Sequence, residues 1–259
     1  MGTGAPRVID IHSHVLYGLD DGAATLADSL AMIRMAAAAG TTHLVCTPHA
    51  NVQYKFEPAL IAERLAQISG HGVEIYSGCD FHLNYENIQD ALDHPAKYTI
   101  NQKCYLLVEF SDLIIFRNTG EIFARLQDSG MIPVITHPER NGLLRQRIAE
   151  IQNWVEAGAR VQITAQSLLG KFGRRAGEFC EILMDRQLAH FVASDAHDCQ
   201  HRPPTLDAAF AWIEQRYGRQ AAELLCVANP RATLDGGPLD FTAAPPRPPA
   251  RKWYQIWRR

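Results

Sequence analysis

Short apolar runs of the strand type alternate along this chain with longer stretches in which apolar residues recur three and four positions apart. Seven runs are typical of strands, at residues 7–11, 43–47, 73–77, 105–109, 132–136, 160–164 and 190–194. The clearest helix follows the first strand, because Thr25 and Asp28 fit a capping box and Gly40 closes the segment. Helical spacing also covers residues 148–156, 176–186 and 206–217.

Repeated strand-helix alternation predicts parallel strands covered by helices. Seven such units follow one another with no linker-like break before Gly236. We therefore expect an α/β fold with one closed or nearly closed β/α barrel over residues 1–235, rather than two domains.

Residues 236–259 differ in composition from the barrel. Gly236-Gly237-Pro238 and the four prolines of residues 243–250 mark the end of the globular unit. The last eight residues, KWYQIWRR, mix cations with aromatic rings, so the tail could contact an anionic membrane surface or a partner. The simpler alternative is a terminus that is loose or docked on the barrel.

Charge and composition narrow the class of protein. The net charge of the 259 residues is −3, and residues 241–259 hold five cationic and no acidic side chains, so residues 1–240 carry −8. An acidic body disfavours binding to nucleic acid. Membrane spans and a secretory signal are not apparent, and the six cysteines occur singly, as reduced thiols do. These features favour a cytoplasmic location.

Four short motifs follow predicted strands and are rich in metal-ligand residues: HSH at 12–14, TPH at 47–49, HPER at 137–140 and SDAH at 194–197. Glu109 ends another strand. Carboxyl ends of parallel strands meet at one end of a barrel, where enzymes of this type build their sites. The motifs therefore predict a multi-metal hydrolytic site.

Spacing within the motifs fits metal ligation. Residues two apart in a strand project to the same side, so His12 can act with His14, and Asp195 with His197. A lone His-x-His is more often a surface or core pair, and only the combination with the other motifs favours ligands. Asp20-Asp21-Gly22 adds carboxylates after the first strand, although it is equally typical of a turn.

Imidazoles and carboxylates without thiolate suit Mn, Fe or Zn. Two or three ions about 4 Å apart would activate a water and hold a phosphate ester between them, so no protein nucleophile is needed. Arg140 and Arg202 follow ligand-type histidines and are placed to hold the non-bridging phosphate oxygens, although a surface salt bridge is the commoner role of an arginine.

Cys180 and Arg186 have the Cys-x5-Arg spacing of cysteine-dependent tyrosine phosphatases. The five residues between them contain no glycine and have a helical pattern, so their N–H groups should be occupied within the helix. The Cys-x5-Arg spacing therefore does not predict a phosphate-binding loop here.

Together the motifs resemble the PHP (polymerase and histidinol phosphatase) superfamily, and within it the bacterial metal-dependent protein-tyrosine phosphatases of capsular and exopolysaccharide production. The resemblance covers residues 8–234. It implies a distorted (β/α)7 barrel, two or three divalent ions, Mn or Fe before Zn or Mg, and a phosphotyrosine protein, a tyrosine autokinase, as substrate. The ligands that it implies are His12, His14, Asp20, His49, Asp80, Glu109, His137, Asp195 and His197, with Arg140 and Arg202 handling phosphate.

One position departs from the family pattern. A bridging glutamate is usual after the third strand, but this chain has Gly78-Cys79-Asp80. Either the shorter Asp80 is the ligand or His82, two residues later, takes over and Asp80 supports a neighbour. Two other functions stay open: a PHP phosphatase for a small phosphomonoester such as histidinol phosphate, and a non-catalytic scaffold acting through the tail.

Overall fold

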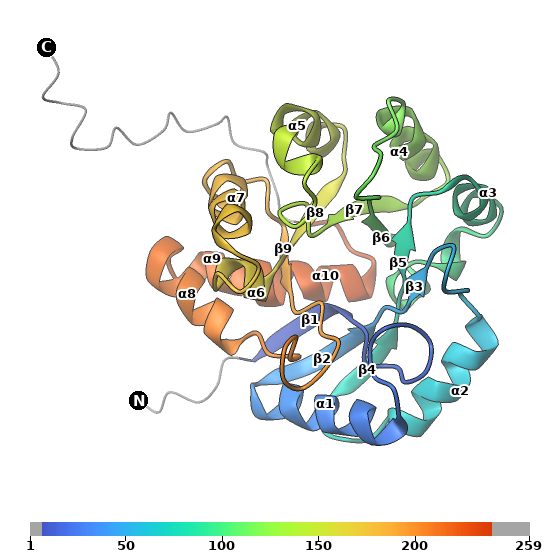
Figure 1. Cartoon of the computed structure of the whole chain (residues 1–259), viewed down its shortest axis with the longest axis vertical. Helices are drawn as coiled ribbons and strands as arrows, with labels where there is room; N and C mark the ends of the chain where they lie inside the picture. Colours follow the sequence, from blue (N-terminus) through green and yellow to red (C-terminus); the bar gives the residue numbers. More distant parts are fainter. Residues whose placement is uncertain (1–6, 240–259) are drawn as a thin grey trace, which may run out of the picture.

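A computed structural model describes residues 7–239, which form a ring of parallel strands surrounded by helices (Figure 1). The strands are β1 (Val8–Ser13), β2 (Thr41–Cys46), β3 (His49–Ala50), β4 (Glu74–Ser77), β5 (Asp80–His82), β6 (Tyr105–Glu109), β7 (Ile132–Thr136), β8 (Arg160–Thr164) and β9 (Phe191–Ala193). The α-helices are α1 (Leu26–Ala38), α2 (Pro58–Ile68), α3 (Tyr85–Asp93), α4 (Thr119–Asp128), α5 (Ile148–Glu156), α6 (Ala165–Leu168), α7 (Arg174–Asp185), α8 (Asp207–Tyr217), α9 (Arg219–Glu223) and α10 (Asn229–Asp235).

The strands form two parallel sheets. One has the order β1-β2-β4, and the other has the order β3-β5-β6-β7-β8-β9. In sequence, β3 and β5 follow β2 and β4 after two-residue breaks. The segment after β9 returns to β1, where the Asp195 N–H donates to the His12 carbonyl and the His14 N–H to the Ala196 carbonyl, each at 2.8 Å. The result is the parallel β/α barrel that the alternating pattern predicts, in the distorted form that the family resemblance implies.

The sequence pattern identifies seven of the nine described strands and helices α1, α5, α7 and α8, but not α2, α3, α4, α6, α9 or α10. Strands β6, β7 and β8 and helix α5 have the predicted bounds. The Thr25–Asp28 capping box is present at the start of α1. Strand β1 runs two residues further than predicted, so that His12 lies within it. Neither β3 nor β5 was predicted.

Alternating side chains of a strand pack into two different apolar layers, one inside the barrel and one between the barrel and the surrounding helices. On β6, Tyr105 and Leu107 belong to a buried cluster that includes Phe191 and residues of β1, β2 and β7. Leu106 and Val108 belong instead to the larger cluster shared with α3, α4, α5 and α7. This period of two places one set inside the ring and the other beneath the helices.

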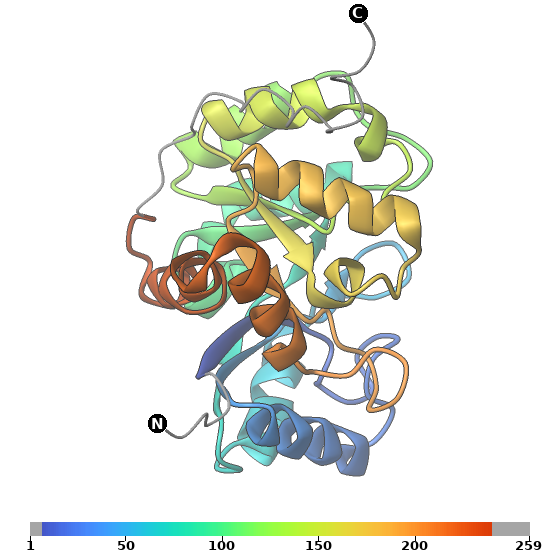
Figure 2. The ribbon, with the colours of Figure 1, turned by 90° about the vertical axis from the view of Figure 1, so that its left-hand side faces the viewer.

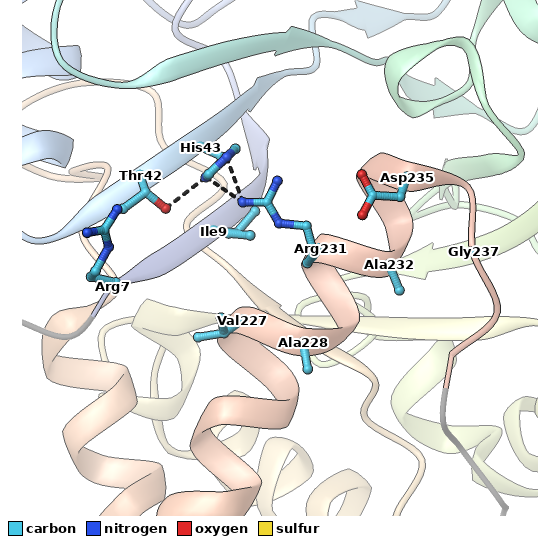
Figure 3. Close-up of a pocket in the computed structure, with 10 residues that line it drawn as sticks. All are labelled: Arg7, Ile9, Thr42, His43, Val227, Ala228, Arg231, Ala232, Asp235 and Gly237. Atoms are coloured by element: carbon cyan, nitrogen blue, oxygen red, sulfur yellow. Dashed lines mark hydrogen bonds between the residues drawn. The ribbon is translucent and has the colours of Figure 1, made fainter.

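The amino end of the barrel carries a hollow of about 620 Å³ between β1, β2 and α10 (Figure 3). In it, Arg231 of α10 contacts His43 of β2, with 2.6 Å between Nη2 and Nε2. Burial and the Arg231 charge lower the pKa of His43. The described residues that line the hollow form none of the side-chain groups that could hold a metal ion. The Arg231–His43 contact attaches α10 to β2.

The chain beyond Asp235 stays attached to the barrel for a short distance. The Tyr105 hydroxyl donates to the Gly237 carbonyl at 2.7 Å. The tail proposed from the sequence lies, from residue 240 onward, outside the described residues. Within residues 7–239 no helix is long and apolar enough to cross a membrane.

Candidate metal centre

The histidines of the first motif lie at the carboxyl end of β1. His12 and His14 are fully buried, and their Nε2 atoms are 3.3 Å apart. The other ring nitrogen of each is held by a neighbour: Gln162 Oε1 lies 3.0 Å from His12 Nδ1, and Asp20 Oδ2 lies 2.6 Å from His14 Nδ1. Such partners fix the ring orientation of a ligating histidine and leave Nε2 for a metal.

Two buried carboxylates lie against these imidazoles. Asp195 Oδ1 is 3.5 Å from His12 Nε2 and 3.4 Å from His14 Nε2. Asp80 Oδ2 is 3.5 Å from His12 Nε2 and 3.2 Å from His49 Nδ1. Each carboxylate therefore lies between two imidazoles, as a ligand shared by neighbouring ions would.

Four groups of ligand-type side chains lie close enough to hold an ion, with all ligand atoms of a group within 4.8 Å of one another. Among the described residues these groups are His14/Asp21/His49/His197, His12/His14/Asp80, His12/His137/Asp195 and His49/Asp80/Glu109. Because His12, His14, His49 and Asp80 each belong to two groups, the groups overlap and form one centre. All of the predicted ligands except Asp20 belong to at least one of these groups, and Asp20 lies beside the centre against His14.

Asp20 and Asp21 have different positions. The sequence predicts Asp20 as a ligand, but its carboxylate lies against His14 Nδ1 and accepts from the backbone N–H of Gly22 at 3.0 Å. Asp21 Oδ1 lies instead 3.4 Å from both His49 Nε2 and His197 Nε2. A Cβ at Gly22 would overlap the His14 backbone, so the glycine lets this loop pack against β1.

Asp80 and His82, the two alternatives for the usual glutamate, lie at different positions relative to these groups. Asp80 is fully buried and belongs to two of the four groups. His82 belongs to none of them, and its Nδ1 lies 3.5 Å from Glu109 Oε2, at the edge of the centre. The geometry favours Asp80 as the ligand.

His137 and Asp195 have positive φ angles, 33° and 51°, a region that non-glycine residues rarely adopt. His137 directly follows β7, and Asp195 lies two residues after the end of β9. The unusual backbone turns both side chains toward His12. Strained conformations of this kind persist where the surrounding fold imposes them, and they cluster at functional sites.

The electrostatics of the centre suit cations. Burial opposes ionisation of Asp80 and Asp195, but the nearby histidines, with Arg140 beside Asp195, hold the pKa of both carboxyls well below the ordinary value. Burial and the Arg140 charge lower the pKa of His137 to about 3, which leaves its imidazole neutral. Among the described residues, His49 Nδ1 and Asp80 Oδ2 are buried without a hydrogen-bond partner. These orphaned donor atoms fit divalent metal ions.

Arg140 and Arg202 enter the centre from the loops after β7 and β9. Both guanidinium groups pair with Oδ2 of Asp195, the oxygen opposite the one that faces His12 and His14. They are therefore beside the candidate ligands, with about a quarter of each side chain exposed. A phosphate bound between the ions and the solvent would contact both guanidinium groups at this position.

The sequence analysis names Asp21 among the carboxylates after the first strand but expects Asp20 as the ligand, and it assigns no role to Gln162. Asp21 is adjacent to the predicted Asp20, and spacing alone does not distinguish their directions. Gln162 lies on β8 and contacts His12, but an isolated glutamine in a strand carries no pattern that identifies it.

Cys180 lies within α7 and is fully buried, and burial raises the pKa of its thiol. It therefore cannot supply a thiolate nucleophile. We expect Cys180→Ala to leave turnover within about twofold of wild type, since small volume changes at one helix position act on stability first. Steady-state kinetics with a phosphotyrosine peptide measures this. Loss of turnover with an intact fold and metal content would contradict it.

Known proteins are similar to this chain in sequence and in fold. Residues 8–235 match the family model described as capsular polysaccharide synthesis, CpsB/CapC. The tyrosine-protein phosphatase YwqE of Bacillus subtilis is 35% identical over 225 residues, which cover 84% of this chain and 88% of YwqE. The tyrosine-protein phosphatase CpsB of Streptococcus pneumoniae is 27% identical over 88% of this chain and 98% of CpsB.

Solved structures agree. A crystal structure from work on YwqE of B. subtilis and CpsB of S. pneumoniae, described as unique metal-dependent tyrosine phosphatases, superposes with a TM-score of 0.85. It is 34% identical and covers 94% of this chain and 100% of its own. Dihydropyrimidinase from Brevibacillus agri, 12% identical with a TM-score of 0.58 over 93% of this chain and 73% of its own, shares the fold alone. The chain therefore belongs to the CpsB/CapC family of capsular polysaccharide synthesis and is a metal-dependent tyrosine phosphatase of that family.

Proposed function

We propose that this enzyme removes phosphate from phosphotyrosine on a bacterial tyrosine autokinase that controls capsular or exopolysaccharide synthesis. The observation that carries the proposal is the overlap of the four ligand groups, because shared ligands place neighbouring ions a few ångströms apart. An autokinase of this kind would present its phosphotyrosines at the inner face of the membrane, so we propose a cytoplasmic site of action.

We assign the ligand role to the side chains of the four groups, and to Asp20 the role of orienting His14. The ligands on this assignment are His12, His14, Asp21, His49, Asp80, Glu109, His137, Asp195 and His197. Two or three divalent ions fit, and the mixed imidazole and carboxylate set suits Mn or Fe, with Zn or Mg as alternatives. Bound there, the ions would supply Lewis-acid activation of water and of the phosphate ester.

Side chains of the protein bind the phosphate and hold the ligand histidines in place. Arg140 and Arg202 provide guanidinium N–H donors for the non-bridging phosphate oxygens, and their charges oppose the build-up of negative charge during hydrolysis. The contacts of Gln162 with His12 and of Asp20 with His14 keep both imidazoles in one orientation while substrate binds and product phosphate leaves.

Removing the metal should abolish turnover. A chelator followed by desalting is expected to give inactive protein, and addition of Mn, Fe or another divalent ion should restore activity. The assay pairs elemental analysis with a panel of a phosphotyrosine peptide, a phosphoserine peptide and histidinol phosphate. Preference for histidinol phosphate would replace the protein substrate with a metabolite, and no turnover by fully loaded protein would favour a scaffold.

A further inference from the structure

Phe172 lies in a tight loop at the same end of the barrel as the candidate metal centre. The loop joins α6, which directly follows β8, to α7. Gly170 and Gly173 have φ angles of +77° and +84°, and the Gly173 N–H donates to the Gly170 carbonyl at 3.1 Å. In Figure 2 this loop lies on the same side of the molecule as the loops that follow β1 and β9. The two glycines thus permit a turn that presents the ring of Phe172.

The ring contacts both phosphate-handling arginines. The guanidinium carbon of Arg140 lies 4.4 Å from the ring centroid of Phe172, and that of Arg202 lies 5.9 Å from it. Both distances are within the range of cation–π attraction. Strands β7, β8 and β9 are neighbours in the sheet, so the ring comes from the segment after the middle strand, and the arginines come from the loops after its two neighbours.

Packing gives Phe172 no other evident task. The side chain is half-buried, and it belongs to none of the three hydrophobic clusters formed by the described residues. The loop itself is held by backbone hydrogen bonds, including one from the Lys171 N–H to the Gln166 carbonyl at 2.9 Å. Removing the ring should therefore leave the barrel and the loop intact.

We propose that Phe172 is a positioning residue for the phosphatase reaction, an aromatic platform that orients Arg140 and Arg202 toward the phosphate dianion. Two guanidinium groups that converge on one site repel each other, and each carries several rotatable bonds. The negative face of the ring attracts both cations and limits their rotamers before substrate arrives. This inference rests on the proposed function, because it needs a phosphate at the centre.

The test compares Phe172→Ala, Phe172→Leu and Phe172→Tyr in the metal-loaded enzyme. Alanine and leucine remove the π face, and tyrosine keeps it. We expect kcat/KM for a phosphotyrosine peptide to fall about 10-fold in the alanine and leucine variants, the scale of two partly exposed cation–π contacts, and to stay near wild type with tyrosine. Leu169→Ala, an exposed neighbour before the loop, is the matched control and should have no effect.

Three further readouts separate positioning from a structural role. Metal content and melting temperature should not change in any variant. The affinity for inorganic phosphate, measured by calorimetry, should fall along with kcat/KM. In an Arg140→Ala/Arg202→Ala background, Phe172→Ala should add little, because the groups that it orients are gone.

Specific results would overturn the proposal. These are wild-type kinetics in Phe172→Ala, full rescue by leucine, or an undiminished effect of Phe172→Ala without the two arginines. A wild-type enzyme that binds phosphate but hydrolyses no phosphotyrosine would refute the proposed function, whereas the phosphate affinities would still decide the role of Phe172.

Discussion

Asp80→Ala is expected to lower both metal occupancy and turnover, the latter by roughly 10²-fold or more, beyond what loss of a group that only orients a ligand produces. The reason is geometric. Asp80 Oδ2 is buried between His12 and His49, and the residue belongs to two ligand groups, so its removal takes one oxygen from each. Elemental analysis of the purified variant, with kinetics on the same sample, measures both effects.

Two variants make the Asp80 result specific. Asp80→Glu keeps the charge on a longer arm and should be much milder. His82→Ala should keep nearly full metal occupancy, because the His82 imidazole belongs to no ligand group of the described residues and pairs with Glu109 at the edge of the centre. Full occupancy in Asp80→Ala together with metal loss in His82→Ala would reverse the assignment, and melting curves exclude simple unfolding as the cause.

Arg140→Ala should reduce kcat by roughly 10²-fold or more while metal content stays unchanged, as is typical when one preorganised charge-stabilising donor is lost. The guanidinium lies beside the candidate ligands and pairs with the outer oxygen of Asp195, but it donates no lone pair to an ion. The expected loss is therefore in the transition state. Kinetics with a phosphotyrosine peptide, next to elemental analysis, measure it.

A matched arginine provides the control for this variant. Arg174 is 84% exposed at the start of α7 and pairs only with Glu178 among the ion pairs of residues 7–239. Arg174→Ala removes the same charge from the chain and should leave kcat unchanged. Normal turnover in Arg140→Ala would remove this residue from the reaction, and an equal loss in both variants would point to a general effect of charge.

The sequence predicts the barrel best where a buried strand is a continuous apolar run closed by a polar residue, as in β6 and β7. It does not predict β3 and β5, which have two and three residues and are too short to show a period. Their separation from β2 and β4 falls at Thr47-Pro48 and Gly78-Cys79. Proline lacks a donor for the ladder and glycine tolerates irregular backbone, but these properties do not specify how the two sheets divide.

The centre was predictable where ligands lie at or just after strand ends, as His137 does after β7 and Asp195 two residues after β9. It was less predictable in loops. Asp20 and Asp21 have the same chemistry, and their spacing does not indicate which carboxylate lies beside the His49 imidazole and which beside His14. The arginine contacts with Phe172 join residues 30 or more positions apart, and such contacts leave no periodic signal in the sequence.

The division of the barrel into two sheets has a consequence for folding. His12 and His14 come from the three-stranded sheet, whereas His49, Asp80 and Glu109 come from the six-stranded one. On the proposed assignment, ion binding therefore ties the carboxyl ends of the two sheets together, and the free energy of unfolding rises with the concentration of free metal. Without ions, we expect local opening to begin at this end, where β1 meets the segment after β9, because the Arg231–His43 contact at the amino end does not depend on metal. Amide hydrogen exchange in β1 and β9 would then report metal loading, even in a variant such as Arg140→Ala that keeps the ligands and loses turnover.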